Sequence, residues 1–230
     1  MSVIAENLQR VQARIQSACQ AAGRDPASVR LLAVSKTFGA DEVRQAHAAG
    51  QQAFGENYIQ EGVDKIQALQ DLDLEWHCIG PIQSNKTRLV AAHFDWVHSV
   101  DRLKIAQRLS EQRPAARGPL QVCMQVNVDG GPTKAGVPPE QAAALASQIA
   151  SLPGLRLRGI MSIPEPAPDF ASALAVHQRS LAVYAALKAQ GFDLDTLSLG
   201  MSADLEAAIH AGSTLVRVGS AIFGARTPQA

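Results

Sequence analysis

The stretch Arg30-Leu31-Leu32-Ala33-Val34-Ser35-Lys36 decides how this sequence is best interpreted. Its apolar residues follow one another without alternation, which is typical of a parallel strand covered on both faces. Parallel strands are joined by crossover connections that are usually helical, so the flanking sequence should alternate between strand and helix patterns. We therefore predict a strand over residues 30–36 within an α/β architecture.

The sequence on both sides of this strand has the expected alternation. Residues 3–22 carry apolar side chains at three- and four-residue steps, which predicts a preceding helix, and Gly23 supplies a stop. The other predicted strands are residues 52–55, 75–80, 96–100, 120–128, 155–163, 196–199 and 215–218. The pattern gives eight strand–helix units, and the strands are too apolar for either face of the sheet to be exposed to water. This favours a (β/α)₈ TIM barrel over an open doubly wound sheet. We expect one domain over residues 1–230.

Composition limits the classes of function. Lys plus Arg equal Asp plus Glu at 21 each, so there is no excess positive charge for nucleic-acid binding. Cys19, Cys78 and Cys123 are far apart and odd in number, which indicates reduced thiols instead of a disulfide framework or a zinc site. The N-terminus has no basic stretch leading into an apolar run, and no segment approaches membrane-spanning length. We expect a soluble, cytoplasmic protein.

Lys36 is the first candidate functional residue, because active sites of these barrels form at the C-terminal ends of the strands. Parity along the strand places Lys36 with Val34 and Leu32, so its amine should reach the barrel mouth from an apolar wall. A partly desolvated amine is a usable nucleophile toward an aldehyde. The alternative is a lysine that extends to solvent at a strand end.

The ends of the last two strands predict a phosphate site. Ser202 follows strand 196–199 and can cap the next helix or turn its hydroxyl toward an anion. Gly219 and Ser220 follow strand 215–218, where their N–H groups could form an anion nest. The alternative is a pair of ordinary helix caps with glycine turns.

Arg217 lies near the end of a predicted buried strand and therefore needs a partner. Its guanidinium can donate to a pyridine nitrogen, which would keep that nitrogen unprotonated and limit carbanion chemistry. A salt bridge to a carboxylate of a neighbouring strand is the alternative. The histidines on predicted helices, His47, His93, His177 and His210, are interpreted as surface or packing residues.

With these residues in place, the sequence resembles the pyridoxal phosphate homeostasis protein family, a one-domain relative of the barrel of alanine racemase that binds pyridoxal 5′-phosphate (PLP). The motifs that carry the resemblance are residues 33–36, 54–58, 76–86, 159–162, 198–202 and 217–226. The resemblance implies that Lys36 holds PLP as a Schiff base and that Arg217 faces the pyridine nitrogen. It further implies that Ser202, Gly219 and Ser220 hold the phosphate, and that Asn57 and Met201 lie near the cofactor.

The family role implied is to bind and protect PLP and to hand it on, with PLP-dependent apo-enzymes as recipients. No His/Asp/Glu cluster has the spacing of metal ligands, so we expect no metal. We also expect a monomer. Cys78 and Ser220 depart from the residues expected in two motifs, and neither would touch the Schiff base. The role of Lys134, in the loosely matched segment 129–136, stays open.

A PLP-dependent amino-acid racemase is the alternative from another class. Racemisation by two bases needs an acid/base group on each face of the substrate carbon, and Lys36 can serve only one. The resembled racemases supply the other as a tyrosine from an additional β domain, which we expect this chain, ending at Ala230, to lack. Tyr58 is the one tyrosine expected at the mouth, and Tyr184 lies in the outer layer. A Schiff-base aldolase acting on a phosphorylated sugar is a third possibility.

Overall fold

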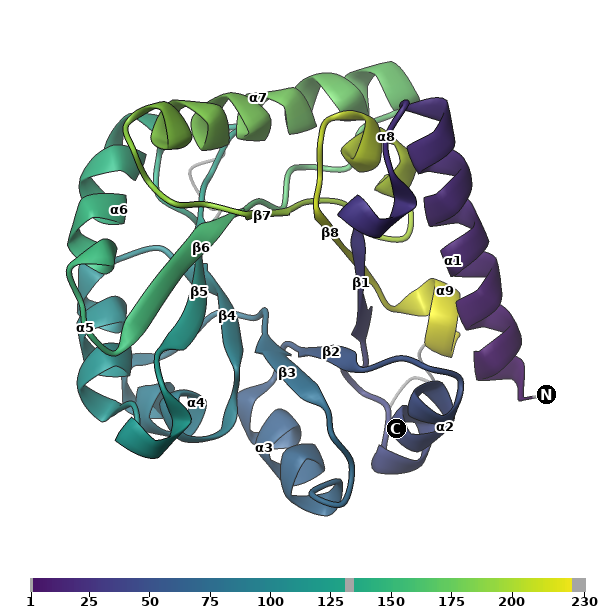
Figure 1. Cartoon of the computed structure of the whole chain (residues 1–230), viewed down its shortest axis with the longest axis horizontal. Coiled ribbons are helices and arrows are strands. Elements are labelled where there is room, and N and C mark those ends of the chain that lie inside the picture. Colours follow the sequence, from purple (N-terminus) through teal and green to yellow (C-terminus); the bar gives the residue numbers. More distant parts are fainter. Residues whose placement is uncertain (1, 131–134, 225–230) are drawn as a thin grey trace.

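The computed structural model describes residues 2–130 and 135–224. Its centre is a closed barrel of parallel strands that pair in chain order, with β8 completing the circle beside β1 (Figure 1). The strands are β1 Arg30–Val34, β2 Ala53–Glu56, β3 Glu75–Cys78, β4 Trp96–Val100, β5 Leu120–Gln125, β6 Leu155–Met161, β7 Thr196–Ser198 and β8 Leu215–Val218. The predicted (β/α)₈ barrel is confirmed.

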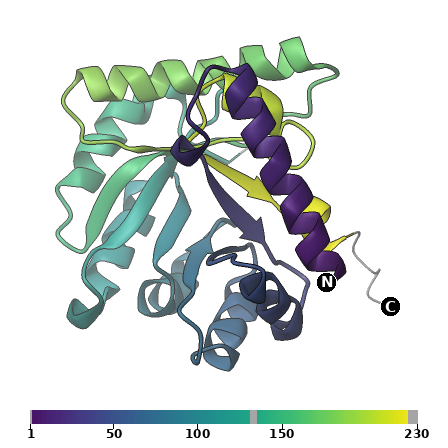
Figure 2. The same cartoon turned by 45° about the vertical axis from the view of Figure 1, so that its right-hand side comes forward.

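Helices surround the barrel and cover its outer face (Figure 1). They are α1 Val3–Ala21, α2 Ala40–Ala48, α3 Ile59–Ala68, α4 Thr87–His93, α5 Leu103–Gln112, α6 Ala142–Ala150, α7 Phe170–Ala189, α8 Leu205–His210 and α9 Ser220–Phe223. The predicted helix before the first strand is α1, which packs along α8 and α9 (Figure 2). Its stripe of Ile4, Leu8, Val11 and Ile15 is buried. None of the described helices is long and apolar enough to cross a membrane.

Several strands end earlier than the sequence pattern predicts. The first ends at Val34 and not at Lys36, because only the N–H of Ser35 continues the pairing, to the carbonyl of Gly55. Thr37 then adopts the left-handed region with φ of 68°. Lys36 therefore lies in a turn two residues beyond the strand.

The barrel interior combines an apolar layer with polar side chains. Leu32 and Val34 of β1 form a cluster with residues of three neighbouring segments, namely Ala53, Ile79 and Leu215. Cys19, Cys78 and Cys123 are buried and free, in agreement with the reduced thiols that we expected. Lys134, whose role the sequence leaves open, lies outside the described residues, as do positions 225 and 226 of the last motif.

Candidate functional site

A cavity of about 510 Å³ opens at the C-terminal ends of the strands, within the size range of small-molecule sites. Apolar side chains such as Val34 and Ile79 form part of its wall. All the site residues predicted from the sequence line this one cavity: Lys36, Asn57, Met201, Ser202, Arg217, Gly219 and Ser220. The fold thus brings together residues that are up to 184 positions apart, from Lys36 to Ser220.

Lys36 enters the cavity half-buried, from the turn after β1. Hydrogen bonds fix the backbone on both sides of it. The carbonyl of Ser35 accepts from the Lys65 ammonium at 2.7 Å, and the N–H of Thr37 donates to a Glu61 oxygen at 2.6 Å. The flanking residues therefore hold the Lys36 backbone at the cavity edge.

Lys65, which sequence reasoning missed, is the centre of this buried cluster. Its ammonium also lies 2.7 Å from Glu56 and 2.7 Å from Glu61, and the Ser35 hydroxyl donates to the same Glu56 oxygen at 2.6 Å. Burial raises the pKa of Glu56, and the Lys65 charge and hydrogen bond oppose that rise. The spacing of Glu61 and Lys65 at i and i+4 on α3 was the only sequence pattern that could have indicated the pair.

Ser202 and Ser220 meet at the other side of the cavity. The Ser220 hydroxyl donates to the Ser202 hydroxyl at 3.3 Å. Ser202 is not the cap of the following helix, as one of our two interpretations proposed, because α8 begins later and Asp204 occupies the cap position. The other interpretation, a hydroxyl directed at an anion, agrees with its place in the cavity lining.

The first turn of α9 adds backbone donors beside these hydroxyls. Gly219 is the cap residue of α9 and Ser220 its first residue, and N–H groups at a helix start have no partner within the helix. A β-carbon on Gly219 would lie 3.1 Å from the Val34 carbonyl oxygen, so glycine allows this close approach to β1. Two hydroxyls and adjacent N–H groups form a suitable set of donors for a phosphate group.

Arg217 lies at the base of the cavity and is 3% exposed. It donates to the carbonyl and hydroxyl oxygens of Ser198, each at 2.7 Å, and to the carbonyl of Ser162 at 2.9 Å. Burial lowers its pKa to about 10, so it stays protonated at neutral pH. Among the described residues it forms no ion pair, and the carboxylate partner that we considered is therefore not found.

Asn57 is one of the residues that line the cavity, and its side chain carries a buried polar atom. Its Oδ1 has no hydrogen-bond partner among the described residues. Its backbone is held closely, since a β-carbon on Gly80 would lie 2.1 Å from the Asn57 carbonyl oxygen. A buried side-chain oxygen without a hydrogen-bond partner is uncommon in folded proteins and leaves an acceptor unused beside the cavity.

The loop after β7 is fixed by Asp204. This carboxylate accepts from the N–H of Met201 at 2.7 Å and from Nε2 of His177 at 2.8 Å. Burial opposes ionisation, yet these hydrogen bonds keep the pKa of Asp204 below its ordinary value. His177 is buried on α7, so its interpretation as a packing residue was incomplete, because it also holds the loop that carries Met201 and Ser202.

Neither tyrosine contributes to the cavity lining. Tyr58 is 55% exposed and lies just before α3. Tyr184 lies on α7, where its hydroxyl donates to the carbonyl of Leu194 and burial raises its pKa to about 12. The prediction that Tyr184 belongs to the outer layer is confirmed.

Known proteins match this chain over nearly its whole length. A family model described as "Alanine racemase, N-terminal domain" matches residues 6–227. The pyridoxal phosphate homeostasis protein of Pseudomonas aeruginosa is 61% identical over 226 residues, which are 98% of this chain and 97% of that protein. The protein of the same name from Escherichia coli K12 is 52% identical and covers 98% of both chains. A structure of PipY from Synechococcus elongatus PCC7942 with PLP bound is 37% identical, with a TM-score of 0.84 over 96% of this chain and 100% of that chain.

Proposed function

Because this chain belongs to the pyridoxal phosphate homeostasis protein family, we propose that it binds PLP in the cavity at the C-terminal mouth and passes it on to PLP-dependent apo-enzymes. The observation that carries this proposal is the convergence of Lys36, Arg217 and the Ser202–Ser220 pair on one cavity. An amine, a buried cation and a set of hydroxyl and N–H donors match the aldehyde, pyridine nitrogen and phosphate of PLP.

The residues present fit this cofactor in detail. Lys36 would bond covalently to it, and Arg217 would donate a hydrogen bond to the pyridine nitrogen. Ser202, Gly219 and Ser220 would hold the phosphate, while Asn57 and Met201 would contact the ring substituents and ring. When bound, PLP supplies an electron sink, and an arginine beside its nitrogen weakens that capacity because the nitrogen stays unprotonated.

We propose a role in binding and transfer instead of racemisation. A racemase needs a second acid/base group opposite Lys36. Tyr58, the candidate for that group, is exposed and is not among the residues that line the cavity, which supports the binding role. Action as a monomer in the cytoplasm belongs to the same proposal.

The experiment that tests this function is incubation of the full chain with PLP, followed by borohydride reduction and peptide mass mapping. The reduced adduct should lie on Lys36 and be lost in Lys36→Ala, while Lys104→Ala, which removes an exposed lysine of α5, should retain it. An adduct that persists in Lys36→Ala would contradict the assignment. Enzyme-like racemase turnover that is lost in Tyr58→Phe would instead favour the enzyme. Transfer of PLP to an apo-enzyme no faster than spontaneous release would count against the carrier role.

A further inference from the structure

A continuous chain of polar side chains crosses the barrel interior from its N-terminal mouth to the cavity. Glu75 lies 2.7 Å from Nε2 of His77, and Nδ1 of His77 lies 2.8 Å from Nε2 of His98. Nδ1 of His98 lies 2.9 Å from the Ser198 hydroxyl, which accepts from Arg217 at 2.7 Å. One chain of hydrogen bonds thus connects residues of β3, β4, β7 and β8.

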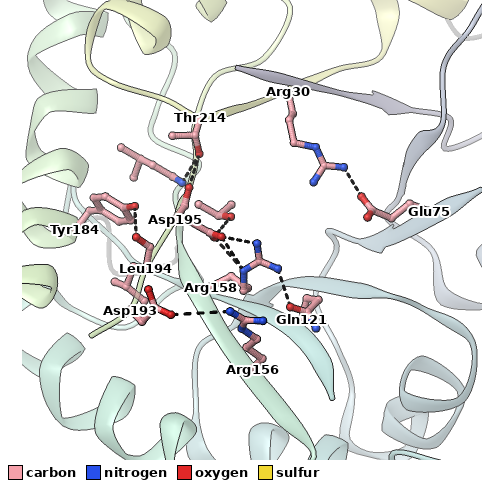
Figure 3. Close-up of polar contacts among 12 residues, drawn as sticks. Arg30, Glu75, Gln121, Arg156, Arg158, Tyr184, Asp193, Leu194, Asp195 and Thr214 are labelled. Carbon is pink, nitrogen blue, oxygen red and sulfur yellow. Dashed lines mark hydrogen bonds and ion pairs between the residues drawn. The ribbon is translucent and has the colours of Figure 1, made fainter. Parts of the chain in front are cut away.

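The middle of this hydrogen-bonded chain of side chains is buried away from water. His77, His98 and Ser198 are fully buried, whereas the Glu75 side chain is 34% exposed at the opposite mouth. There the Arg30 guanidinium lies 2.6 Å from Glu75 (Figure 3). The ring of Trp96 stacks on His77 with centroids 5.3 Å apart.

Arg158 lies over the ring of Trp96, the residue that stacks on His77. Its guanidinium lies 4.7 Å from the centre of the Trp96 ring. This guanidinium forms an ion pair with Asp195 and donates a hydrogen bond to Gln121 (Figure 3). The hydrogen-bonded chain is therefore buried over its whole length except at Glu75.

The ionised carboxylate of Glu75 permits only one direction for the hydrogen bonds of this chain. A carboxylate has no proton to donate, so Nε2 of His77 must donate to it. In a neutral ring Nδ1 of His77 then accepts from Nε2 of His98. Nδ1 of His98 in turn accepts from the Ser198 hydroxyl, whose oxygen is left to accept from Arg217.

We propose that Glu75 is a remote positioning residue of the cofactor site, whose negative charge sets the tautomers of His77 and His98 and so presents Ser198 to Arg217 as an acceptor. Hydrogen bonds in a buried chain polarise one another, which lets the charge act at a distance. As a consequence, N–H groups of Arg217 stay bonded to Ser198, and this fixes the orientation of the Arg217 guanidinium at the base of the cavity. The role of Arg217 toward the pyridine nitrogen rests on the proposed function, but the hydrogen-bond direction does not.

The electrostatics of the three titratable groups agree with this direction. Burial lowers the pKa of His77 and lowers that of His98 well below its ordinary value, so both rings are neutral. Although partial burial opposes ionisation, the hydrogen bond from His77 and the charge and hydrogen bond of Arg30 keep the pKa of Glu75 below its ordinary value. A charged carboxylate at one end and two neutral rings are the conditions that the proposal requires.

The test is ¹⁵N NMR of the histidine rings and the arginine guanidinium groups in the full chain, without PLP and with it. The wild type should show a single tautomer for His77 and for His98, with Nε2 protonated in both. Glu75→Gln removes the charge and lets the residue at 75 donate or accept, so both rings should lose their single tautomer and the Arg217 resonances should shift. With PLP bound, the absorption maximum of the cofactor should shift as well.

Two further variants keep the test decisive. Ser198→Ala removes the hydroxyl but leaves Arg217 its bonds to the carbonyls of Ser198 and Ser162, so adding Glu75→Gln to it should shift Arg217 no further. Asp193→Asn removes an exposed carboxylate at the same mouth (Figure 3) and should change neither ring nor Arg217. The proposal is overturned if Glu75→Gln leaves His98 in its original tautomer, or if Asp193→Asn shifts Arg217 equally. The ring measurements without PLP separate this outcome from failure of the cofactor assignment.

Discussion

The Lys65 ammonium group lies 2.7 Å from the main-chain carbonyl oxygen of Ser35, the residue directly before Lys36. Lys65 is 6% exposed, so this bond forms away from solvent. The same ammonium contacts Glu61, which accepts from the N–H of Thr37 directly after Lys36. One buried lysine therefore holds the backbone on both sides of the lysine that we assign to the cofactor.

Replacing Lys65 with methionine should both destabilise the protein and impair attachment of PLP to Lys36. The change leaves Glu56 and the Ser35 carbonyl without their cationic partner, and breaking a buried ion pair on one side costs about 3–5 kcal/mol. Urea unfolding measures the first effect, and the fraction of Lys36 trapped by borohydride at limiting PLP measures the second. Lys104→Met, on the exposed face of α5, is the matched control.

The double variant Lys65→Met with Glu56→Gln distinguishes positioning from stability alone. It removes the uncompensated carboxylate and should recover part of the lost stability, because the buried charge is gone. Attachment to Lys36 should stay impaired, since Ser35 still lacks its partner. Full recovery of attachment would show that Lys65 acts through stability and does not position Lys36.

Removing the hydroxyls of Ser202 or Ser220 should weaken PLP binding without changing the free energy of unfolding of the protein alone. A hydrogen bond to a charged group contributes about 1.5–3 kcal/mol, which is about a tenfold or larger rise in Kd for each alanine substitution. Fluorescence titration with PLP measures the loss. Pyridoxal, which lacks the phosphate, is the control ligand: if its affinity falls by the same factor, these serines do not contact the phosphate.

The parts of the site that the sequence predicts are those set by chain-local geometry. Strand ends meet at one mouth of a parallel barrel, so Lys36, Arg217 and Gly219 could be assigned to a common cavity from strand patterns alone. Ser202 lies in the cavity lining, and of its two interpretations the helix cap was wrong. The helix begins at Leu205 with Asp204 as its cap residue, and the side chain of Asp204 accepts a hydrogen bond from the N–H of Met201 in the turn before it.

The residues that sequence reasoning missed act across elements. Lys65 on α3 bonds Ser35 directly after β1, and His177 on α7 bonds Asp204 after β7. His98 bonds Ser198 at a separation of 100 residues. Their partners are fixed by the closure of the barrel, which no local pattern specifies. A buried histidine in an apolar strand such as 96–100 is only a general indication that a polar partner must exist.

Gly200 should be more sensitive to alanine than a glycine with similar backbone angles elsewhere. Its φ is 88°, and a β-carbon there would lie 2.5 Å from the β-carbon of Ala208. Gly191, with φ of 93°, has no atom within 4 Å of the same position among the described residues and is the matched control.

Gly191→Ala should therefore lower the free energy of unfolding only by the backbone strain of about 1–2 kcal/mol. Gly200→Ala should lower it more. It should also raise the Kd for PLP, because it displaces the loop of Met201 and Ser202. Unfolding and PLP titrations of both variants check this. Equal loss of stability, with unchanged PLP affinity in both, would contradict the assigned role of the loop.

Glu75 should make the protein lose stability in acid over a defined range. Its pKa is about 2 in the folded protein and ordinarily 4.5, so between these values the unfolded chain binds more protons and stability rises with pH. The contribution is fully present above pH 4.5 and is lost as the pH falls toward 2. Urea unfolding at a series of pH values should therefore give a shallower acid slope for Glu75→Gln than for the wild type.

Asp193→Asn, which removes a carboxylate that is 96% exposed, should keep the wild-type slope. An unchanged slope in Glu75→Gln would mean that His77 and Arg30 do not stabilise the ionised carboxylate. The charge of Glu75 could then not set the direction of the hydrogen bonds that lead to Arg217.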